Sequence, residues 1–123
     1  MTVARFVLDT NIILYFLGGR LADSFPAGAY AISVISELEL LAYPGLVSSE
    51  EQRIRDFLAD VPITDLTQSV THHAGNLRNR FRLNLPDAIV AATALALEAP
   101  LLTNAQRFLP FGGLPPRAPR GNS

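Results

Sequence analysis

The chain opens with an apolar stretch that ends in an acid, Val3-Ala4-Arg5-Phe6-Val7-Leu8-Asp9-Thr10-Asn11. Residues 3–8 form a short, nearly continuous apolar run, which is typical of a parallel strand covered on both faces. The run from Thr10 to Leu17 then predicts a helix that ends at Gly18-Gly19. Asp9 is therefore expected at the carboxyl end of a strand, where open α/β sheets bind their ligands.

Strand-like and helix-like segments alternate along the rest of the chain. Further strands are expected at residues 28–33, 61–64 and 100–103, and further helices at 34–43, from 48 or 49 to about 61, at 67–84 and at 87–97. Such alternation with short connections predicts an α/β fold, a three-layer α/β/α sandwich around a mainly parallel sheet of four or five strands. Residues 1–111 are expected to form a single domain. Residues 112–123 hold three prolines and three glycines, which predicts a flexible tail.

Composition limits the function before any motif is considered. A chain of 123 residues that is 49% hydrophobic can bury a core of its own. Its formal net charge of −1 excludes a global basic field, so that any contact with a nucleic acid must be local. The absence of cysteine excludes disulfides, zinc–thiolate sites and a thiol nucleophile. Without a leader-like or membrane-spanning segment, a soluble cytoplasmic protein is expected.

Two further acids, Glu39 and Asp87, stand in segments that are otherwise almost wholly hydrophobic. In a parallel sheet these positions and Asp9 can converge at the carboxyl ends of the strands. Converging carboxylates repel each other unless a cation compensates them. Because the acids are hard oxygen ligands without histidine or cysteine nearby, the expected cation is Mg²⁺ or Mn²⁺. Such a site can polarise a phosphodiester, which indicates metal-dependent hydrolysis of a nucleic acid.

Four blocks of sequence together resemble the PIN-domain ribonucleases, and in particular the VapC-type toxins of bacterial toxin–antitoxin pairs. They come in the order of that family and span residues 3–109. The blocks are Leu8-Asp9-Thr10-Asn11, Ile32-Ser33-Val34-Ile35-Ser36-Glu37-Leu38-Glu39-Leu40-Leu41, Leu85-Pro86-Asp87-Ala88-Ile89-Val90-Ala91-Ala92-Thr93-Ala94, and Leu101-Leu102-Thr103-Asn104 with Phe108.

This resemblance implies a Mg²⁺- or Mn²⁺-dependent endoribonuclease that works as a toxin, usually forms a homodimer and is inhibited by a cognate antitoxin protein. It places Asp9, Glu39 and Asp87 at the acidic positions that hold the metal and carry catalysis. The supporting polar positions are Asn11, Thr103 and Asn104.

Arg78 and Arg82 are spaced four residues apart on one predicted helix face and could hold RNA phosphates. A solvated helix face explains this pair equally well.

The last block departs from the family pattern. Ala105 stands where the family commonly has an acid, and Arg107 stands where some members have another. The missing carboxylate leaves three interpretations open: a single-metal site, a site completed by substrate phosphate, or a degenerate PIN domain that binds RNA or protein without cleaving it.

Simpler interpretations exist for each acid. Asp9 could cap the helix that it precedes, and Asp87 could be a first-turn acid that the helix dipole favours. Glu37 competes with Glu39, and only one of them can face the site, because residues two apart on a helix differ by about 200° in direction. The resemblance puts Glu39 at the family's position, and Glu37 is assigned to solvent. A phosphohydrolase with Asp9 as covalent nucleophile would need a second acid in place of Asn11 and a lysine, and the chain contains no lysine.

Overall fold

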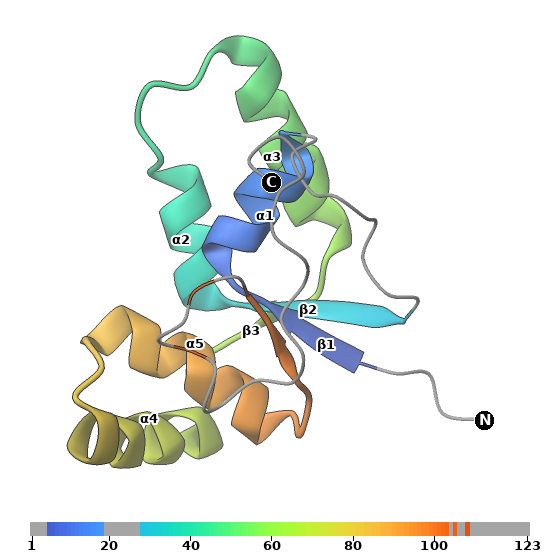
Figure 1. Ribbon diagram of the computed structural model, residues 1–123. Coiled ribbons are helices and arrows are strands. Elements are labelled where there is room, and N and C mark those ends of the chain that lie inside the picture. The colour runs from blue at the N-terminus through green and yellow to red at the C-terminus, as the bar shows by residue number, and fades with distance from the viewer. Residues whose placement is uncertain (1–4, 19–27, 104, 106–107, 109–123) are drawn as a thin grey trace.

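Four parallel strands form the centre of the computed structural model, which describes residues 5–18, 28–103, 105 and 108. Their order across the sheet is β3-β2-β1-β4, so that the first strand lies inside the sheet (Figure 1). The strands are β1 (Arg5–Leu8), β2 (Ala29–Ser33), β3 (Ile63–Thr64) and β4 (Leu101–Leu102).

The alternating side chains in the buried half of β1 and in β4 show why these parts of the strands are apolar. Val7 pairs with Leu101, and both side chains join the hydrophobic cluster on one face of the sheet. Leu8 pairs with Leu102, and both join the cluster on the other face. Since helices cover both faces, a polar side chain within either strand would be buried without water.

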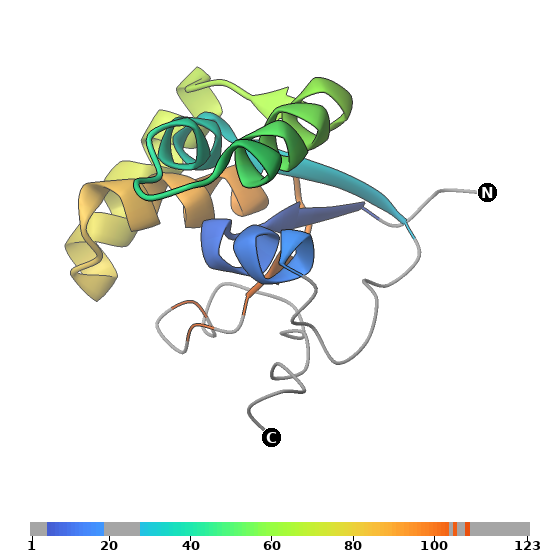
Figure 2. The same ribbon diagram turned by 90° about the horizontal axis from the view of Figure 1, so that it is seen from above.

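Helices cover the two faces in two groups (Figure 1). One group packs with Val7 and Leu101, and the other packs with Leu8 and Leu102. The first contains α4 (Gln68–Phe81) and α5 (Leu85–Ala96), and the second contains α1 (Thr10–Leu17) and α3 (Ser48–Asp60). A fifth helix, α2 (Val34–Leu41), contacts α1, α3 and α5 and lies between α3 and α5 in Figure 2. The predicted α/β sandwich is confirmed, with four strands in the described part of the chain.

Helix starts follow the capping side chains. Ser33 ends β2, and its Oγ accepts a hydrogen bond from the backbone N–H of Ile35 at 3.0 Å, so that α2 begins directly after the strand, as the sequence predicted. Asn84 accepts from the N–H of Asp87 at 2.9 Å. This cap starts α5 at Leu85, two residues before the predicted start.

Helix ends differ from the predictions for local reasons. The helix expected at residues 67–84 ends at Phe81 because Arg82 adopts a left-handed conformation, with φ 56° and ψ 33°. The helix expected at residues 34–43 ends at Leu41, ahead of Pro44, which cannot continue a helix.

Two predictions remain as they were. The domain limits at residues 1–111 depend partly on residues outside the described ones, and the proposed tail, 112–123, lies wholly outside them. None of the helices that the structure describes is both long and apolar enough to cross a membrane.

Candidate functional site

Asp9 directly follows β1 and is only 4% exposed. The Thr103 hydroxyl, which follows the neighbouring strand β4 and is buried as well, donates a hydrogen bond to Asp9 Oδ2 at 2.8 Å. The two residues meet because β1 and β4 are adjacent and parallel, with the Asp9 N–H donating to the Leu102 carbonyl at 3.1 Å. The structure thus brings together a predicted acid and a predicted polar residue that are 94 positions apart.

Helix capping does not explain the Asp9 carboxylate. Asp9 occupies the position before α1, but its side chain makes no capping hydrogen bond to that helix. A buried carboxylate needs compensation from donors or from a cation. Thr103 supplies one such donor. Asp9 therefore has the placement and the chemistry of a metal ligand, a buried carboxylate at the carboxyl end of a parallel strand.

Glu39 is connected to the same place through Thr10. The Thr10 hydroxyl donates to Glu39 Oε1 at 2.6 Å, a length typical of a bond to an ionised carboxylate. The Oγ of Ser36, fully buried one helical turn before Glu39, lies 2.9 Å from Thr10 Oγ1. Thr10 follows Asp9 in the chain, so that the polar groups of α1 and α2 meet beside the end of β1.

Sequence reasoning missed Thr10 and Ser36. A signal for Ser36 was present, since a hydroxyl three residues before Glu39 lies on the same face of the helix. Burial of the two glutamates is also the reverse of what was expected, because Glu37 is partly buried and Glu39 is exposed. Glu39 nevertheless accepts a hydrogen bond from Thr10 through its carboxylate. Glu37 lies about 200° further round the helix and so points in another direction.

Asp87 lies in the first turn of α5 and is partly buried. Its backbone N–H is capped by Asn84, and the seven residues that follow it, Ala88 to Ala94, are all buried. A carboxylate in this turn benefits from the positive end of the helix dipole. Asp87 therefore fits the interpretation of a first-turn acid that the helix dipole favours, and this does not conflict with a role in a metal site.

The other predicted residues have different outcomes. Asn11 is exposed in the first turn of α1. Asn104 lies outside the described residues. Arg78 and Arg82 are exposed, and Arg78 Nε donates to the Leu83 carbonyl at 3.4 Å, so that Arg78 also supports the link between α4 and α5.

The described part of the chain contains no group of three or more His, Cys, Asp or Glu side chains placed to hold a metal ion. The predicted metal centre of Asp9, Glu39 and Asp87 therefore stays a prediction. The chemistry of the donors fits Mg²⁺ or Mn²⁺, since such ions need only one or two direct carboxylates and fill their other positions with water or phosphate. Buried Asp9 is the donor that the structure supports most directly.

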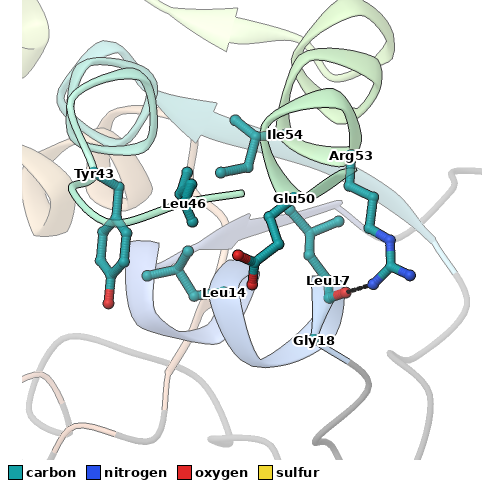
Figure 3. A pocket seen from close by; sticks show the side chains of 8 residues that line it. All are labelled: Leu14, Leu17, Gly18, Tyr43, Leu46, Glu50, Arg53 and Ile54. Carbon is teal, nitrogen blue, oxygen red and sulfur yellow. Dashed lines mark hydrogen bonds between the residues drawn. The ribbon is translucent and has the colours of Figure 1, made fainter. Parts of the chain in front are cut away.

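The structure also has a hollow of about 140 Å³ (Figure 3). It is lined by the carboxyl-terminal part of α1, the segment that follows α2, and α3, and Arg53 Nη1 donates across it to the Leu17 carbonyl at 3.0 Å. None of Asp9, Glu39 and Asp87 lines it. The hollow is a separate feature and not the space between the acids.

The chain is similar to known proteins over most of its length. The PIN domain family model matches residues 6–112. A chain of a toxin–antitoxin complex from Klebsiella pneumoniae is 32% identical, with 84% of this chain and 89% of that chain covered and a TM-score of 0.68. No curated protein is similar enough to be matched.

Two other solved structures share the fold at lower identity. A chain of VapBC2 from Rickettsia felis, bound to a DNA fragment from its promoter, is 23% identical, with 87% of this chain and 92% of that chain covered and a TM-score of 0.70. A chain of VapBC-5 from Mycobacterium tuberculosis is 18% identical, with 91% of this chain and 94% of that chain covered and a TM-score of 0.70. The predicted resemblance to VapC-type PIN domains is confirmed, and the chain belongs to the PIN domain family.

Proposed function

We propose that this protein is a Mg²⁺- or Mn²⁺-dependent endoribonuclease that acts as the toxin of a toxin–antitoxin pair. The observation that carries the proposal is the buried Asp9 carboxylate at the end of β1, hydrogen-bonded to Thr103 and adjacent to the Thr10–Glu39 bond. PIN domains are generally nucleases that depend on divalent metal ions. The match to a chain of a toxin–antitoxin complex at 32% identity supports the assignment to a toxin.

The side chains have distinct roles in this proposal. Asp9, Glu39 and Asp87 would hold the metal, which when bound supplies Lewis-acid polarisation of the scissile phosphodiester. Thr103 holds Asp9 in one orientation and compensates its burial. Thr10 likewise holds the Glu39 carboxylate in one orientation. Ser36 contacts the Thr10 hydroxyl and keeps that hydroxyl in one position.

A protein partner is supported by an apolar surface close to Glu39. Four large hydrophobic side chains on α2 and the segment leading to α3 are between 46% and 59% exposed: Leu38, Leu41, Tyr43 and Val47. Exposed apolar patches of this kind mark sites of protein association. We assign this surface to the cognate antitoxin, which would cover the acids when it binds, and we expect the free toxin to be a homodimer.

The proposal is tested with purified protein, Mn²⁺ and a panel of structured RNAs. We expect cleavage at defined positions, no cleavage in chelator and no cleavage by Asp9→Asn. Intact RNA throughout the panel with wild-type protein and Mn²⁺, together with unimpaired growth on expression in bacteria, would contradict it.

A second function is favoured by one observation. Ala105, which replaces a family acid, is partly buried and packs against the hydrophobic cluster of α4 and α5. The domain could therefore be a degenerate member that binds RNA or protein without cleaving. In that case RNA binding would persist in the same experiment without any cleavage, and Asp9→Asn would change neither result.

A further inference from the structure

Helix α4 differs from α3 in the sign of its charge. It contains two arginines, Arg78 and Arg80, and no acid, and Arg82 follows it directly. Helix α3 contains four acids and two arginines. The whole chain has a formal net charge of −1, so that it can attract a polyanion only locally. Among the described helices and strands, α4 has the most positive charge.

The exposed face of α4 is polar. The helix packs against α5 through buried Val70, Ala74 and Leu77, and it lies at the edge of the molecule in Figure 1. The opposite face is formed by Gln68, His72, Gly75, Asn76 and Asn79, which are all exposed. Surfaces that bind proteins usually have an apolar centre, which these five residues do not supply. Amide side chains are instead common donors to the phosphates and sugars of nucleic acids.

Gly75 lies in the middle of this face, where a glycine is costly. Among residues other than proline, glycine is the least favourable in a helix interior, because it loses the most backbone freedom on folding. Nothing in the described part of the chain requires it, since a Cβ built at Gly75 would meet no atom within 4 Å. A missing side chain on an exposed helix face allows another backbone to approach closely. The glycine therefore indicates that a partner lies close to α4 at this point.

Arg78 lies one turn after Gly75 and connects this face to the candidate site. Its Nε donates to the Leu83 carbonyl at 3.4 Å, in the segment that joins α4 to α5. A guanidinium group has five N–H donors, so that this bond orients the group and leaves donors for a phosphate. Asp87 follows Leu83 by four positions, a span of at most about 14 Å. A polyanion that lies along α4 is therefore led toward the Asp87 carboxylate.

We propose that the exposed face of α4 binds the sugar–phosphate backbone of the RNA substrate outside the cleavage position. Arg78 contacts a phosphate, Asn76 and Asn79 donate to phosphate or ribose oxygens, and Gly75 lets the RNA backbone approach the helix. Such contacts carry no sequence information, so that this face positions the RNA and does not select the cleaved sequence. The inference rests on the proposed ribonuclease function. A second copy of the chain is a poorer occupant, because two such faces would bring like charges together.

The first test is Gly75→Ala, for which stability and RNA binding should change in opposite directions. The melting temperature should rise, because alanine favours the helix and its methyl group has open space. The affinity for a labelled structured RNA, measured in chelator by fluorescence anisotropy, should fall severalfold. Gly75→Gln, with a longer side chain, should weaken binding further. Equal RNA affinity for the wild type and both variants would overturn the proposal.

The second test changes the charge of the face. Arg78→Gln should lower the slope of log affinity against log salt by about 0.7 to 0.9, as expected for one lost phosphate contact. Its matched control is Arg55→Gln, which removes the same charge from an exposed position on α3. An unchanged slope for Arg78→Gln, or an equal change for Arg55→Gln, would contradict a specific contact.

A charge added to the face decides the outcome if Arg78→Gln lowers the melting temperature. Asn79→Asp keeps the size of the side chain and should weaken RNA binding severalfold, because the new carboxylate repels phosphate. Its control, Ser49→Asp, adds the same charge at an exposed position on α3 and should have little effect. Equal RNA affinity for Asn79→Asp and the wild type would overturn the proposal.

The outcomes also distinguish this inference from the proposed function. If the wild-type protein cleaves RNA with Mn²⁺ but no change on α4 alters RNA affinity, the ribonuclease function stands and the α4 surface is wrong. If Gly75→Ala changes the oligomeric state in size-exclusion chromatography and leaves RNA affinity unchanged, the face is a subunit interface and the proposal fails. If the wild-type protein neither binds nor cleaves any RNA, both proposals fail.

Discussion

The end of β1 and the corner between α4 and α5 are both rich in functional groups, but they differ in burial. At the end of β1, Asp9 and Thr103 are buried and hydrogen-bonded to each other. At the corner, Arg80 and Arg82 are exposed to solvent. A buried polar pair contributes to stability as well as to chemistry, because losing one partner leaves the other unsatisfied. Exposed charges contribute little to stability, so that removing the charge of Arg80 or Arg82 should leave the free energy of unfolding nearly unchanged.

The largest expected effect is the loss of cleavage when an acid is neutralised. Asp9→Asn and Asp87→Asn keep the shape of the side chain but remove the charge that attracts a cation. We expect each to lower the cleavage rate by about 10³-fold or more, equivalent to about 4 kcal/mol of transition-state stabilisation. Single-turnover rates with Mn²⁺ measure this, and Asp65→Asn at an exposed position is the control. Growth arrest by either variant at the wild-type expression level would disprove the assignment.

The comparison is sharpened by Thr103→Val, which keeps the size of the side chain but removes the donor to buried Asp9. The free energy of unfolding should fall by about 1–3 kcal/mol, since a buried carboxylate loses a hydrogen bond. Thr103→Ser, which keeps the hydroxyl, should lose less. Urea unfolding measures all three proteins. In the Asp9→Asn background the cost of Thr103→Val should differ from its cost in the wild-type protein, because the two side chains are in contact. If Thr103→Val costs the same free energy of unfolding in both backgrounds, the hydrogen bond between Thr103 and Asp9 contributes nothing to stability.

A smaller effect is expected for Thr10→Val, because its partner Glu39 is exposed and water can replace the lost donor. Cleavage should fall about tenfold, as is typical when a residue that orients a metal ligand is removed. Thr10→Ser should restore most of the rate. If Thr10→Ser cleaves RNA as slowly as Thr10→Val, the methyl group of Thr10 has a packing role and its hydroxyl does not position Glu39.

The parts that could be predicted from the sequence are those set by local pattern. The apolar run before Asp9 and the helix after it follow from periodicity and from the glycine that ends the helix. The pairing of Asp9 with Thr103 could be expected once both residues were placed at the ends of parallel strands.

The parts that could not be predicted depend on three-dimensional contacts or on individual backbone conformations. Thr10 meets Glu39 only because α1 and α2 pack side by side, and no local pattern shows which helices become neighbours. The end of α4 at Phe81 depends on a left-handed arginine, a conformation that the sequence gives no reason to expect. Whether Asp87 joins Asp9 and Glu39 around a cation depends on distances that motif order does not define.

The smallest effect should come from Ala105, which links the two regions of the comparison. Its backbone N–H donates to Thr103 Oγ1 at 3.0 Å, so that it is two hydrogen bonds from Asp9, and its side chain packs against the cluster of α4 and α5. Ala105→Asp restores the family acid at this place. In chelator the added charge should lower the melting temperature, because residue 105 is partly buried and is connected through Thr103 to the Asp9 carboxylate.

With Mn²⁺ the sign should reverse. A fourth oxygen ligand should tighten metal binding by up to about tenfold, or about 1.4 kcal/mol, and a ligand that binds only the folded state raises the melting temperature. Ala105→Asn is the control, since it adds similar bulk without charge. Calorimetric titration and melting curves of the three proteins decide the outcome. Metal affinity that is the same for Ala105→Asp and wild type would show that a carboxylate at residue 105 does not reach the metal, and that the acids of this site act without a fourth carboxylate.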